Sequence, residues 1–365
     1  MPLRWLLLAA SARCLVVPRA PRPGNKLHDS VAPRPCTALH AKVVVADGFT
    51  ATANAGFASL RDAWLPAVGD GDELEVHDRT APGDVVAVLD GAAVAVVNKV
   101  RITDAVLAAL PDLGLVCVTA TGVNNVDLDA CARRGVLVSN VPAYSTPSVA
   151  QWVAACLLDA AVALRPQAGA VAAGAWAASP DFCAFPERTF ELRGRTFVAV
   201  GRGAIGEAAG AVAEALGMAV VFARAPGRGG DGGELARALA TADVVSLHVP
   251  LADNTARLVD GRFLAALKPG AILVNSARGG VVDEAALLAA LDEGSLERAY
   301  LDVLDDEPPS DPASTSARLA AHPRAVVTPH TAWATNEARQ RLRDVACGNV
   351  RAFLAGEPLP TPAAS

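Results

Sequence analysis

The chain has 365 residues, of which 52% are hydrophobic and 19% are charged, and its formal net charge at pH 7 is −6. This length allows two domains with sizeable cores, and the composition is typical of a globular α/β protein. The acidic balance, without basic runs interleaved with aromatics, argues against a nucleic-acid partner. No later segment reaches 18 uninterrupted apolar residues, so no membrane span is expected. The seven cysteines are scattered without a C-x-x-C pair, which argues against a disulfide framework and a zinc site.

Residues 1–41 differ in composition from the rest of the chain. They contain six basic residues and one acidic residue, several prolines and a short apolar run at Leu3–Ala10. A basic, acid-poor and structureless segment of this kind is typical of a targeting sequence. A plastid and a mitochondrion are the two alternative destinations. The third explanation is a misassigned start of translation, in which case the protein would be cytoplasmic.

Residues 42–145 alternate between short apolar strands and helices, which is typical of a parallel sheet. We expect strands at 42–47, 93–97, 115–119 and 136–139, and helices at 61–65, 104–110 and 128–134, with 84–89 as helix or linker. A longer apolar helix, 148–164, starts after Thr146-Pro147. We expect this helix to lead into a second domain and to pack against a partner subunit, and we expect residues 165–193 to be rich in loops.

Residues 195–224 predict a strand, a tight glycine turn, a helix and a second strand. Gly201, Gly203 and Gly206 have G-x-G-x-x-G spacing, between an expected strand at 197–200 and an expected helix at 207–216. The first glycine permits the turn, the second lets the backbone approach a pyrophosphate, and the third lets helix and strand pack closely. The helix N-terminus also attracts phosphate. We therefore predict a dinucleotide site formed by Gly201, Arg202, Gly203, Ala204, Ile205 and Gly206.

The second half continues the same alternation. We expect a strand at 218–222, then strands at 244–250, 271–275, 298–303 and 325–328, and helices at 234–240, 260–267, 284–293 and 337–355. The predicted fold is α/β, with two Rossmann-like doubly wound parallel-sheet domains and the active site in the cleft between them. The expected units are a targeting or disordered segment (1–41), a substrate or catalytic domain (42–145 plus 332–358), a dinucleotide-binding Rossmann domain (146–331) and a tail (359–365).

Three polar residues follow strand ends in the second half: Arg278, Glu307 and His330. Ligands of open parallel sheets collect beyond the carboxyl ends of the strands, so these side chains should converge near a nicotinamide. A guanidinium can hold the carboxylate of a 2-oxo acid, and a histidine can protonate its carbonyl oxygen. A carboxylate beside that histidine would fix its tautomer and favour its protonated form. Taken singly, Arg278 could form a surface salt bridge, Glu307 could be a solvated charge and His330 could be a satisfied loop histidine. The combination favours catalysis.

Several motifs together resemble those of the D-isomer-specific 2-hydroxyacid dehydrogenases. They are ATGVNNVD at 120–127, the Gly201 loop, 244–251, KPGAILVNSARGGVVD at 268–283, LDVLDDEP at 301–308 and TPHTAW at 328–333. The resemblance covers most of the chain from Val43 onward. It implies that Arg278 binds the substrate, that His330 is the acid/base and that Glu307 is its partner. It also places Val249, Pro250 and Asp302 at the cofactor, with Asp302 holding the nicotinamide carboxamide, and it implies a homodimer.

Within this family the nearest branch resembles glycerate dehydrogenase, also called hydroxypyruvate reductase. The motifs that indicate this branch are Asn98-Lys99, the NNVD loop and HTAWATNEARQRL at 330–342. Backbone N–H groups at Asn98-Lys99 and Gly122-Val123 are expected to bind the substrate carboxylate. The resemblance implies reduction of hydroxypyruvate or glyoxylate to D-glycerate or glycolate. Two alternatives remain open: a phosphoglycerate dehydrogenase-like enzyme, and a nucleotide-sensing corepressor or scaffold on the same fold.

The cofactor preference depends on the end of the strand at 218–222. NAD enzymes usually carry Asp or Glu there, to bind the ribose hydroxyls. This chain has Arg224 at that position, with Arg228 nearby. These cations could bind a 2′-phosphate, which favours NADPH, although Arg224 could instead stack on adenine or point to solvent. The expected cofactor is therefore NAD(P)H, and Trp333 is expected either to wall the substrate pocket or to lie in the core.

Overall fold

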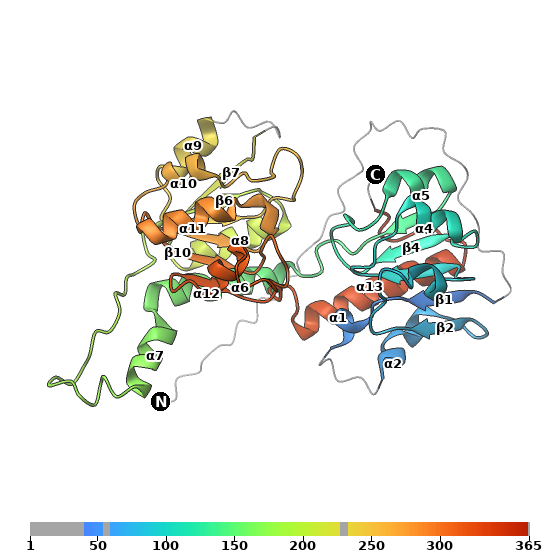
Figure 1. The fold of residues 1–365 in the computed structure, drawn as a ribbon, viewed down its shortest axis with the longest axis horizontal. Coiled ribbons are helices and arrows are strands. Elements are labelled where there is room, and N and C mark those ends of the chain that lie inside the picture. Colours follow the sequence, from blue (N-terminus) through green and yellow to red (C-terminus); the bar gives the residue numbers. More distant parts are fainter. Residues whose placement is uncertain (1–39, 54–58, 227–232, 364–365) are drawn as a thin grey trace, which may run out of the picture.

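A computed structural model describes residues 40–53, 59–226 and 233–363. Two parallel sheets, each flanked by helices, form two domains that lie next to each other (Figure 1). The fold class expected from the sequence, two parallel-sheet α/β domains, is confirmed. The expected targeting segment, except for His40 and Ala41, lies outside the described residues, and so does Arg228.

The first domain has a five-stranded sheet in the order β2-β1-β3-β4-β5, with all neighbours parallel. Its strands are β1 (Lys42–Val45), β2 (Glu73–Val76), β3 (Val94–Val97), β4 (Leu115–Val118) and β5 (Leu137–Ser139). β3 and β4 are buried at every residue, because helices cover both faces of the sheet. The strand order reverses direction between β1 and β3, which opens a crevice beyond their carboxyl ends.

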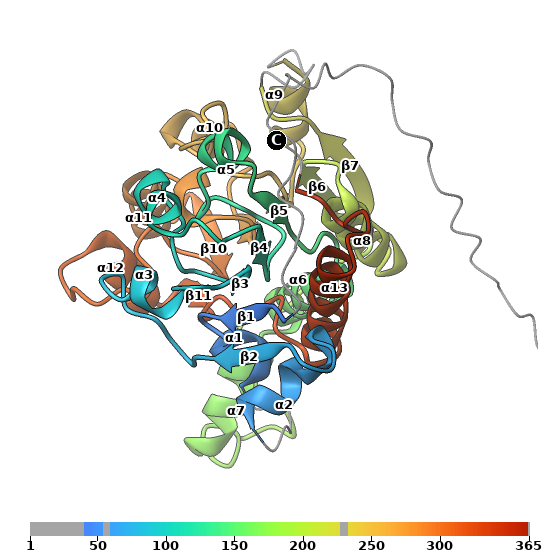
Figure 2. The ribbon, with the colours of Figure 1, turned by 90° about the vertical axis from the view of Figure 1, so that its right-hand side faces the viewer.

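The two faces of this sheet are covered by different helices (Figure 2). One face carries α1 (Phe49–Thr52), α2 (Leu60–Trp64), a 3₁₀ turn (Leu65–Ala67) and the C-terminal helix α13 (Asn336–Leu354). The other face carries α3 (Val85–Val88), α4 (Asp104–Ala109) and α5 (Leu128–Arg134). α13 therefore brings the end of the chain back onto the first domain, where Leu342, Ala346 and Val350 are fully buried.

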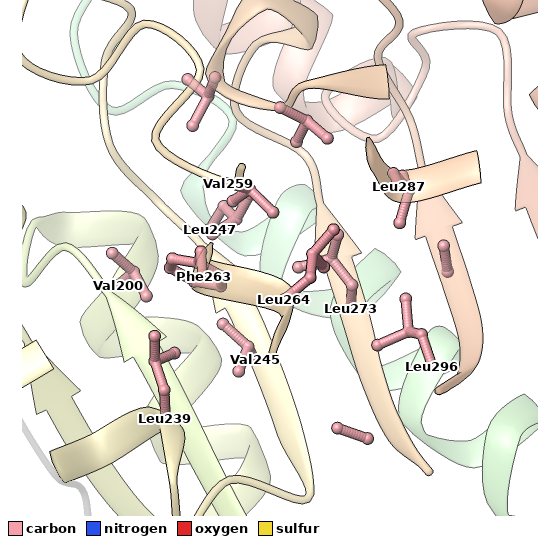
Figure 3. Packing of buried hydrophobic residues seen from close by; sticks show 14 of the residues in the cluster. Val200, Leu239, Val245, Leu247, Val259, Phe263, Leu264, Leu273, Leu287 and Leu296 are labelled. Atoms are coloured by element: carbon pink, nitrogen blue, oxygen red, sulfur yellow. The ribbon is translucent and has the colours of Figure 1, made fainter. Parts of the chain in front are cut away.

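The second domain has a six-stranded parallel sheet in the order β11-β10-β9-β8-β6-β7. Its strands are β6 (Thr196–Val200), β7 (Ala219–Ala223), β8 (Val244–Leu247), β9 (Ala271–Asn275), β10 (Leu296–Leu301) and β11 (Ala325–Val327). Its helices are α6 (Thr146–Val162), α8 (Ala204–Ala215), α9 (Gly233–Leu239), α10 (Gly261–Ala265), α11 (Glu284–Glu293) and α12 (Thr315–Ala321). Strand and helix side chains such as Val245, Leu273 and Leu287 form the core on one face (Figure 3).

The structure corrects the sequence-based elements at several places. Residues 165–193 were expected to be loops, but α7 (Leu164–Ala172) lies there and projects from the second domain (Figure 1). None of its residues is buried, and Pro166 and Gly169 within it favour a loop in the sequence. The edge strand β2 and the helix α12 were not expected, because segments of four and seven residues show little periodicity. β8 ends at Leu247, three residues earlier than expected, so that His248–Pro250 form a loop.

Within the described part of the chain, no single helix has the length and hydropathy to cross a bilayer, and only α6 with α7, across a 55° bend, meets those limits. The cysteines in this part form no disulfide, and no three His, Cys, Asp or Glu side chains gather as a metal site there.

Candidate active site

A cavity of about 850 Å³ lies between the two domains. The first domain contributes Asn98, Lys99, Thr121 and Gly122, and the second contributes Ile205, His248, Val249, Pro250, Arg278, Asp302, Glu307 and His330. The strand order of the second sheet reverses between β6 and β8, so Ile205 and Val249 lie at its reversal point. Of the residues named from the sequence, Val123, Arg224 and the glycine-loop residues other than Ile205 do not line this cavity.

His330 and Glu307 form a hydrogen-bonded pair of ionisable side chains in the cavity. Nδ1 of His330 lies 2.7 Å from Oε2 of Glu307, and about a third of each side chain is exposed. The backbone N–H of Leu304 donates to Oε1 of Glu307 at 2.8 Å. Burial alone would raise the pKa of Glu307, but the hydrogen bond and charge of His330 outweigh it, so this pKa lies below its usual value. With Nδ1 engaged, Nε2 is the ring nitrogen left to exchange a proton with a ligand.

Asp302 holds the loop that carries His330. Its carboxylate is buried and accepts hydrogen bonds from the backbone N–H groups of Thr331 and Ala332, both at 2.9 Å, and from the hydroxyl of Thr328 at 2.6 Å. The backbone N–H of His330 donates to the carbonyl oxygen of Asp302, and His330 has a φ of 54°. Burial raises the pKa of Asp302 despite these bonds. The contact of Asp302 with a nicotinamide, implied by the family resemblance, stays a prediction.

Arg278 lies where the two domains approach each other. It follows β9 and is half-buried, and its Nη1 donates to the carbonyl oxygen of Ala277 at 2.7 Å. A Cβ added at Gly122 of the first domain would lie 2.9 Å from Nη2 of Arg278. The guanidinium therefore reaches the loop that follows β4, and a carboxylate bound there could contact both domains.

The expected role of the N–H groups at Asn98-Lys99 is wrong. Both groups, together with the N–H of Val100, donate to the carboxylate of Asp47, which follows β1. The Asn98 side chain is also engaged, because it donates to Thr119. Burial raises the pKa of Asp47 although the three N–H groups oppose this. Lys99 remains available: its side chain is exposed at the cavity, and its positive charge helps to lower the pKa of Glu307.

The glycine loop has the geometry that a pyrophosphate requires. Gly201 has a φ of 105°, and a Cβ there would lie 2.5 Å from the carbonyl oxygen of His248. A Cβ on Gly206 would lie 2.1 Å from the carbonyl oxygen of Gly201, whereas a Cβ on Gly203 would meet nothing within 4 Å. α8 begins at Ala204, three residues earlier than expected, and no side chain caps its N-terminus. Open space at Gly203 and free N–H groups beside it fit a dinucleotide phosphate.

His248 is a candidate that sequence reasoning missed. It follows β8 and lines the cavity, and both of its ring nitrogens are buried without a hydrogen-bond partner among the described residues. Burial lowers the pKa of His248 to about 4, so its ring is neutral near pH 7. Unpaired buried nitrogens are costly unless a ligand or water meets them. In the sequence, His248 could have been singled out because it directly precedes Val249-Pro250, at the end of the strand next to the glycine loop.

Aromatic side chains form one wall of the cavity. Tyr144 and Trp333 lie on the two chain segments that connect the domains, and their rings make an edge-to-face contact with centroids 6.0 Å apart. Burial raises the pKa of the Tyr144 phenol to about 12. The indole N–H of Trp333 donates to the carbonyl oxygen of His330 at 2.8 Å. Trp333 therefore lines the cavity and also supports the histidine.

Arg224 is exposed and directly follows β7. The positively charged side chain of Arg202 lies close to the same strand. Its guanidinium is 4.8 Å from the ring centroid of Phe222, which belongs to β7. Arg202 also forms an exposed ion pair with Glu207 at 3.3 Å. Two positive side chains therefore flank the end of the strand where the adenosine ribose of a bound dinucleotide would lie.

The chain is similar in sequence to a family of known proteins. Residues 154–332 match the family model described as "D-isomer specific 2-hydroxyacid dehydrogenase, NAD binding domain". The glycerate dehydrogenase of Methylorubrum extorquens is 40% identical over 285 residues, which cover 78% of this chain and 90% of that protein. The hydroxypyruvate reductase of Blautia hydrogenotrophica is 34% identical over 327 residues, or 87% of this chain and 98% of that protein.

A solved structure shows the same overall architecture. The NADPH-dependent glyoxylate/hydroxypyruvate reductase of Sinorhizobium meliloti, crystallised with NADP and malonate, superposes with a TM-score of 0.74. It is 27% identical, and the match covers 89% of this chain and 97% of that one.

Proposed function

This chain belongs to the D-isomer-specific 2-hydroxyacid dehydrogenase family, and we propose that it reduces hydroxypyruvate or glyoxylate with NAD(P)H, giving D-glycerate or glycolate. One observation carries the proposal: Arg278 and the His330–Glu307 pair face a single cavity beside the glycine loop. The relatives with the names glycerate dehydrogenase and hydroxypyruvate reductase support the choice of substrates.

Each side chain has a distinct part in the proposed reaction. When bound, the nicotinamide cofactor supplies the hydride that reduces the carbonyl carbon. Arg278 binds the carboxylate of the 2-oxo acid through two parallel N–H···O bonds and so orients the neighbouring carbonyl. Nε2 of His330 donates a proton to the carbonyl oxygen as that oxygen becomes a hydroxyl. Glu307 holds Nδ1 and stabilises the imidazolium until the proton is transferred, and His330 then takes a new proton from solvent.

The cofactor preference is proposed to be NADPH. Arg224 occupies the position at the end of β7 where a carboxylate would favour NAD, and Arg202 adds a second positive charge close by. A guanidinium binds a 2′-phosphate well because its planar fork of N–H donors can bond two phosphate oxygens at once and the two charges are opposite.

We also propose a homodimer. α6, α7 and the segment after them expose large apolar side chains: Leu158, Val162, Leu164, Val171, Trp176, Phe182 and Phe185. Phe182 and Phe185 are each about nine-tenths exposed, which favours an interaction surface over a solvated arm. Sedimentation velocity should give twice the chain mass, and a monomer at micromolar concentration would contradict this proposal.

The basic composition of residues 1–41 supports delivery to an organelle, either a plastid or a mitochondrion. A fusion of these residues to a fluorescent protein should accumulate in one of the two. Diffuse cytoplasmic fluorescence would contradict the proposal.

The function is tested with a panel of 2-oxo acids, each supplied with NADH and with NADPH. We expect hydroxypyruvate and glyoxylate to be reduced with the highest kcat/KM, and pyruvate and larger 2-oxo acids to be reduced more slowly. Preference for a phosphorylated 2-oxo acid would instead favour a phosphoglycerate dehydrogenase-like enzyme. Cofactor binding without turnover of any 2-oxo acid would favour a sensing protein.

A further inference from the structure

A buried carboxylate that the proposed reaction does not use lies behind the loop that carries Glu307. Glu284 is the first residue of α11 and only 6% of it is exposed. Oε1 of Glu284 accepts a hydrogen bond from the backbone N–H of Asp305 at 2.8 Å. Oε2 accepts one from the hydroxyl of Ser316 at 2.6 Å. A buried carboxylate is costly to keep unless such bonds satisfy it, so these contacts define what Glu284 does in the fold.

Ser316 extends the same network to the next residue of the loop. It lies in the first turn of α12 and is 2% exposed, and its hydroxyl oxygen accepts from the backbone N–H of Asp306 at 3.2 Å. Glu284 and Ser316 thus hold two consecutive N–H groups directly ahead of Glu307. Because the N–H of Leu304 donates to Glu307 itself, every N–H from residue 304 to residue 306 has a side-chain acceptor.

The other side of this loop is fixed by close backbone packing. A Cβ on Gly279, the residue after Arg278, would lie 1.9 Å from the carbonyl oxygen of Leu304. The loop therefore lies between Gly279 on one side and the Glu284–Ser316 pair on the other. Its position determines where the Glu307 carboxylate meets Nδ1 of His330.

We propose that Glu284 and Ser316 are positioning residues, which hold the Glu307 carboxylate against Nδ1 of His330. The proposal rests on the proposed function for its kinetic consequences, but not for its effect on the histidine. Without either anchor, the 305–306 backbone would exchange its protein acceptors for water and Glu307 would move from the imidazole. The carboxylate would then stabilise the imidazolium less, and the alkaline limb of the reductase pH profile would move to lower pH.

Conservative and truncating variants distinguish the positioning role of Glu284 from the effect of its negative charge. Glu284→Gln keeps an oxygen for the N–H of Asp305 and offers an amide N–H to the hydroxyl of Ser316, so it should retain the wild-type pH profile. Glu284→Ala and Ser316→Ala should shift the alkaline limb and lower kcat about ten- to hundredfold, because small misplacements of catalytic groups are this costly. The KM for NADPH should not change.

A matched control lies two residues before Ser316. The hydroxyl of Ser314 caps α12 by accepting from the N–H of Ala317 at 3.1 Å and has no role in the network. Ser314→Ala should weaken the same helix and leave the pH profile unchanged. If Ser314→Ala and Ser316→Ala shift the profile equally, helix stability explains the effect and the proposal is wrong.

The decisive experiment follows the imidazole of His330 by NMR titration in the cofactor-free protein, assigned with a His330→Asn variant. The titration midpoint should fall in Glu284→Ala and Ser316→Ala and stay in place in Glu284→Gln and Ser314→Ala. Identical midpoints in wild type and in Ser316→Ala would overturn the proposal, even if Glu284→Ala failed to fold. This result does not depend on a substrate, so inactivity of the wild type towards 2-oxo acids would count against the proposed function alone.

Discussion

Nδ1 of His330 lies 2.7 Å from Oε2 of Glu307, and the two residues come from loops that follow different strands, β11 and β10. The pairing leaves Nε2 for the substrate and links the proton donor to a carboxylate that solvent only partly reaches. The proposed proton transfer depends on this hydrogen bond, and variants of the pair and of nearby residues test it.

Glu307→Gln removes the charge at nearly constant size. The folded-state pKa of Glu307 lies below its ordinary value of 4.5, so the ionised carboxylate stabilises the fold above pH 4.5. This contribution is lost as the pH falls through the lowered folded-state pKa. Denaturant unfolding at pH 6 should therefore show wild type more stable than the variant, with the difference shrinking at lower pH. A difference that stays constant with pH would contradict a charge pair with His330.

Arg278→Lys keeps the positive charge but loses the planar fork. A lysine can make one strong bond to the substrate carboxylate where the guanidinium makes two, so KM for hydroxypyruvate should rise and kcat/KM should fall about tenfold to a hundredfold. Affinity for NADPH, measured by fluorescence, serves as the internal control and should not change. Unaltered KM and kcat would exclude the proposed carboxylate contact.

Gly203 and Gly206 should respond differently to alanine. At Gly206 the new Cβ would collide with the carbonyl oxygen of Gly201, so Gly206→Ala should destabilise the protein by about 1–3 kcal/mol. At Gly203 the new Cβ meets only open space, so Gly203→Ala should leave Tm unchanged and weaken cofactor binding. Thermal unfolding and cofactor titration of both variants give this comparison. Wild-type cofactor affinity in Gly203→Ala would place the pyrophosphate elsewhere.

Arg224→Asp should reverse or abolish the preference for NADPH. The carboxylate repels a 2′-phosphate and can accept hydrogen bonds from the ribose hydroxyls of NADH. The ratio of kcat/KM for the two cofactors is the measurement. Arg133→Asp, an exposed change of the same charge on α5 of the other domain, should leave the ratio as in wild type. An unchanged ratio in Arg224→Asp would show that the end of β7 does not select the cofactor.

The features that could be predicted from sequence are those encoded locally. The glycine spacing, the buried strands and the polar residues just after β9, β10 and β11 can be recognised within a few residues. The positions of Arg278, Glu307 and His330 around one cavity then follow from the rule that ligands bind beyond strand ends. The four-residue strand β2 is too short to leave a clear pattern, and α7 buries none of its residues.

Contacts between distant residues could not be predicted in the same way. Asp47 binds N–H groups more than fifty residues away, and nothing around it in the sequence identifies those partners. The backbone groups of Asn98 and Lys99 were therefore wrongly expected to be free. Glu284 reads as an ordinary residue in the first turn of a helix, and only the packing of α11 and α12 behind the 304–307 loop reveals its contacts. His248 was read as part of a strand, because the pattern extended β8 beyond its end.

The most direct test of the account compares wild type with His330→Ala in the reduction of hydroxypyruvate, with NADPH saturating and its binding measured separately. We predict that wild type oxidises NADPH and forms D-glycerate in equal amounts. The variant should bind NADPH as wild type does and turn over at least about a hundredfold more slowly, as expected for loss of a general acid. Hydroxypyruvate reduction by His330→Ala at the wild-type rate would contradict the assignment of His330 as the proton donor.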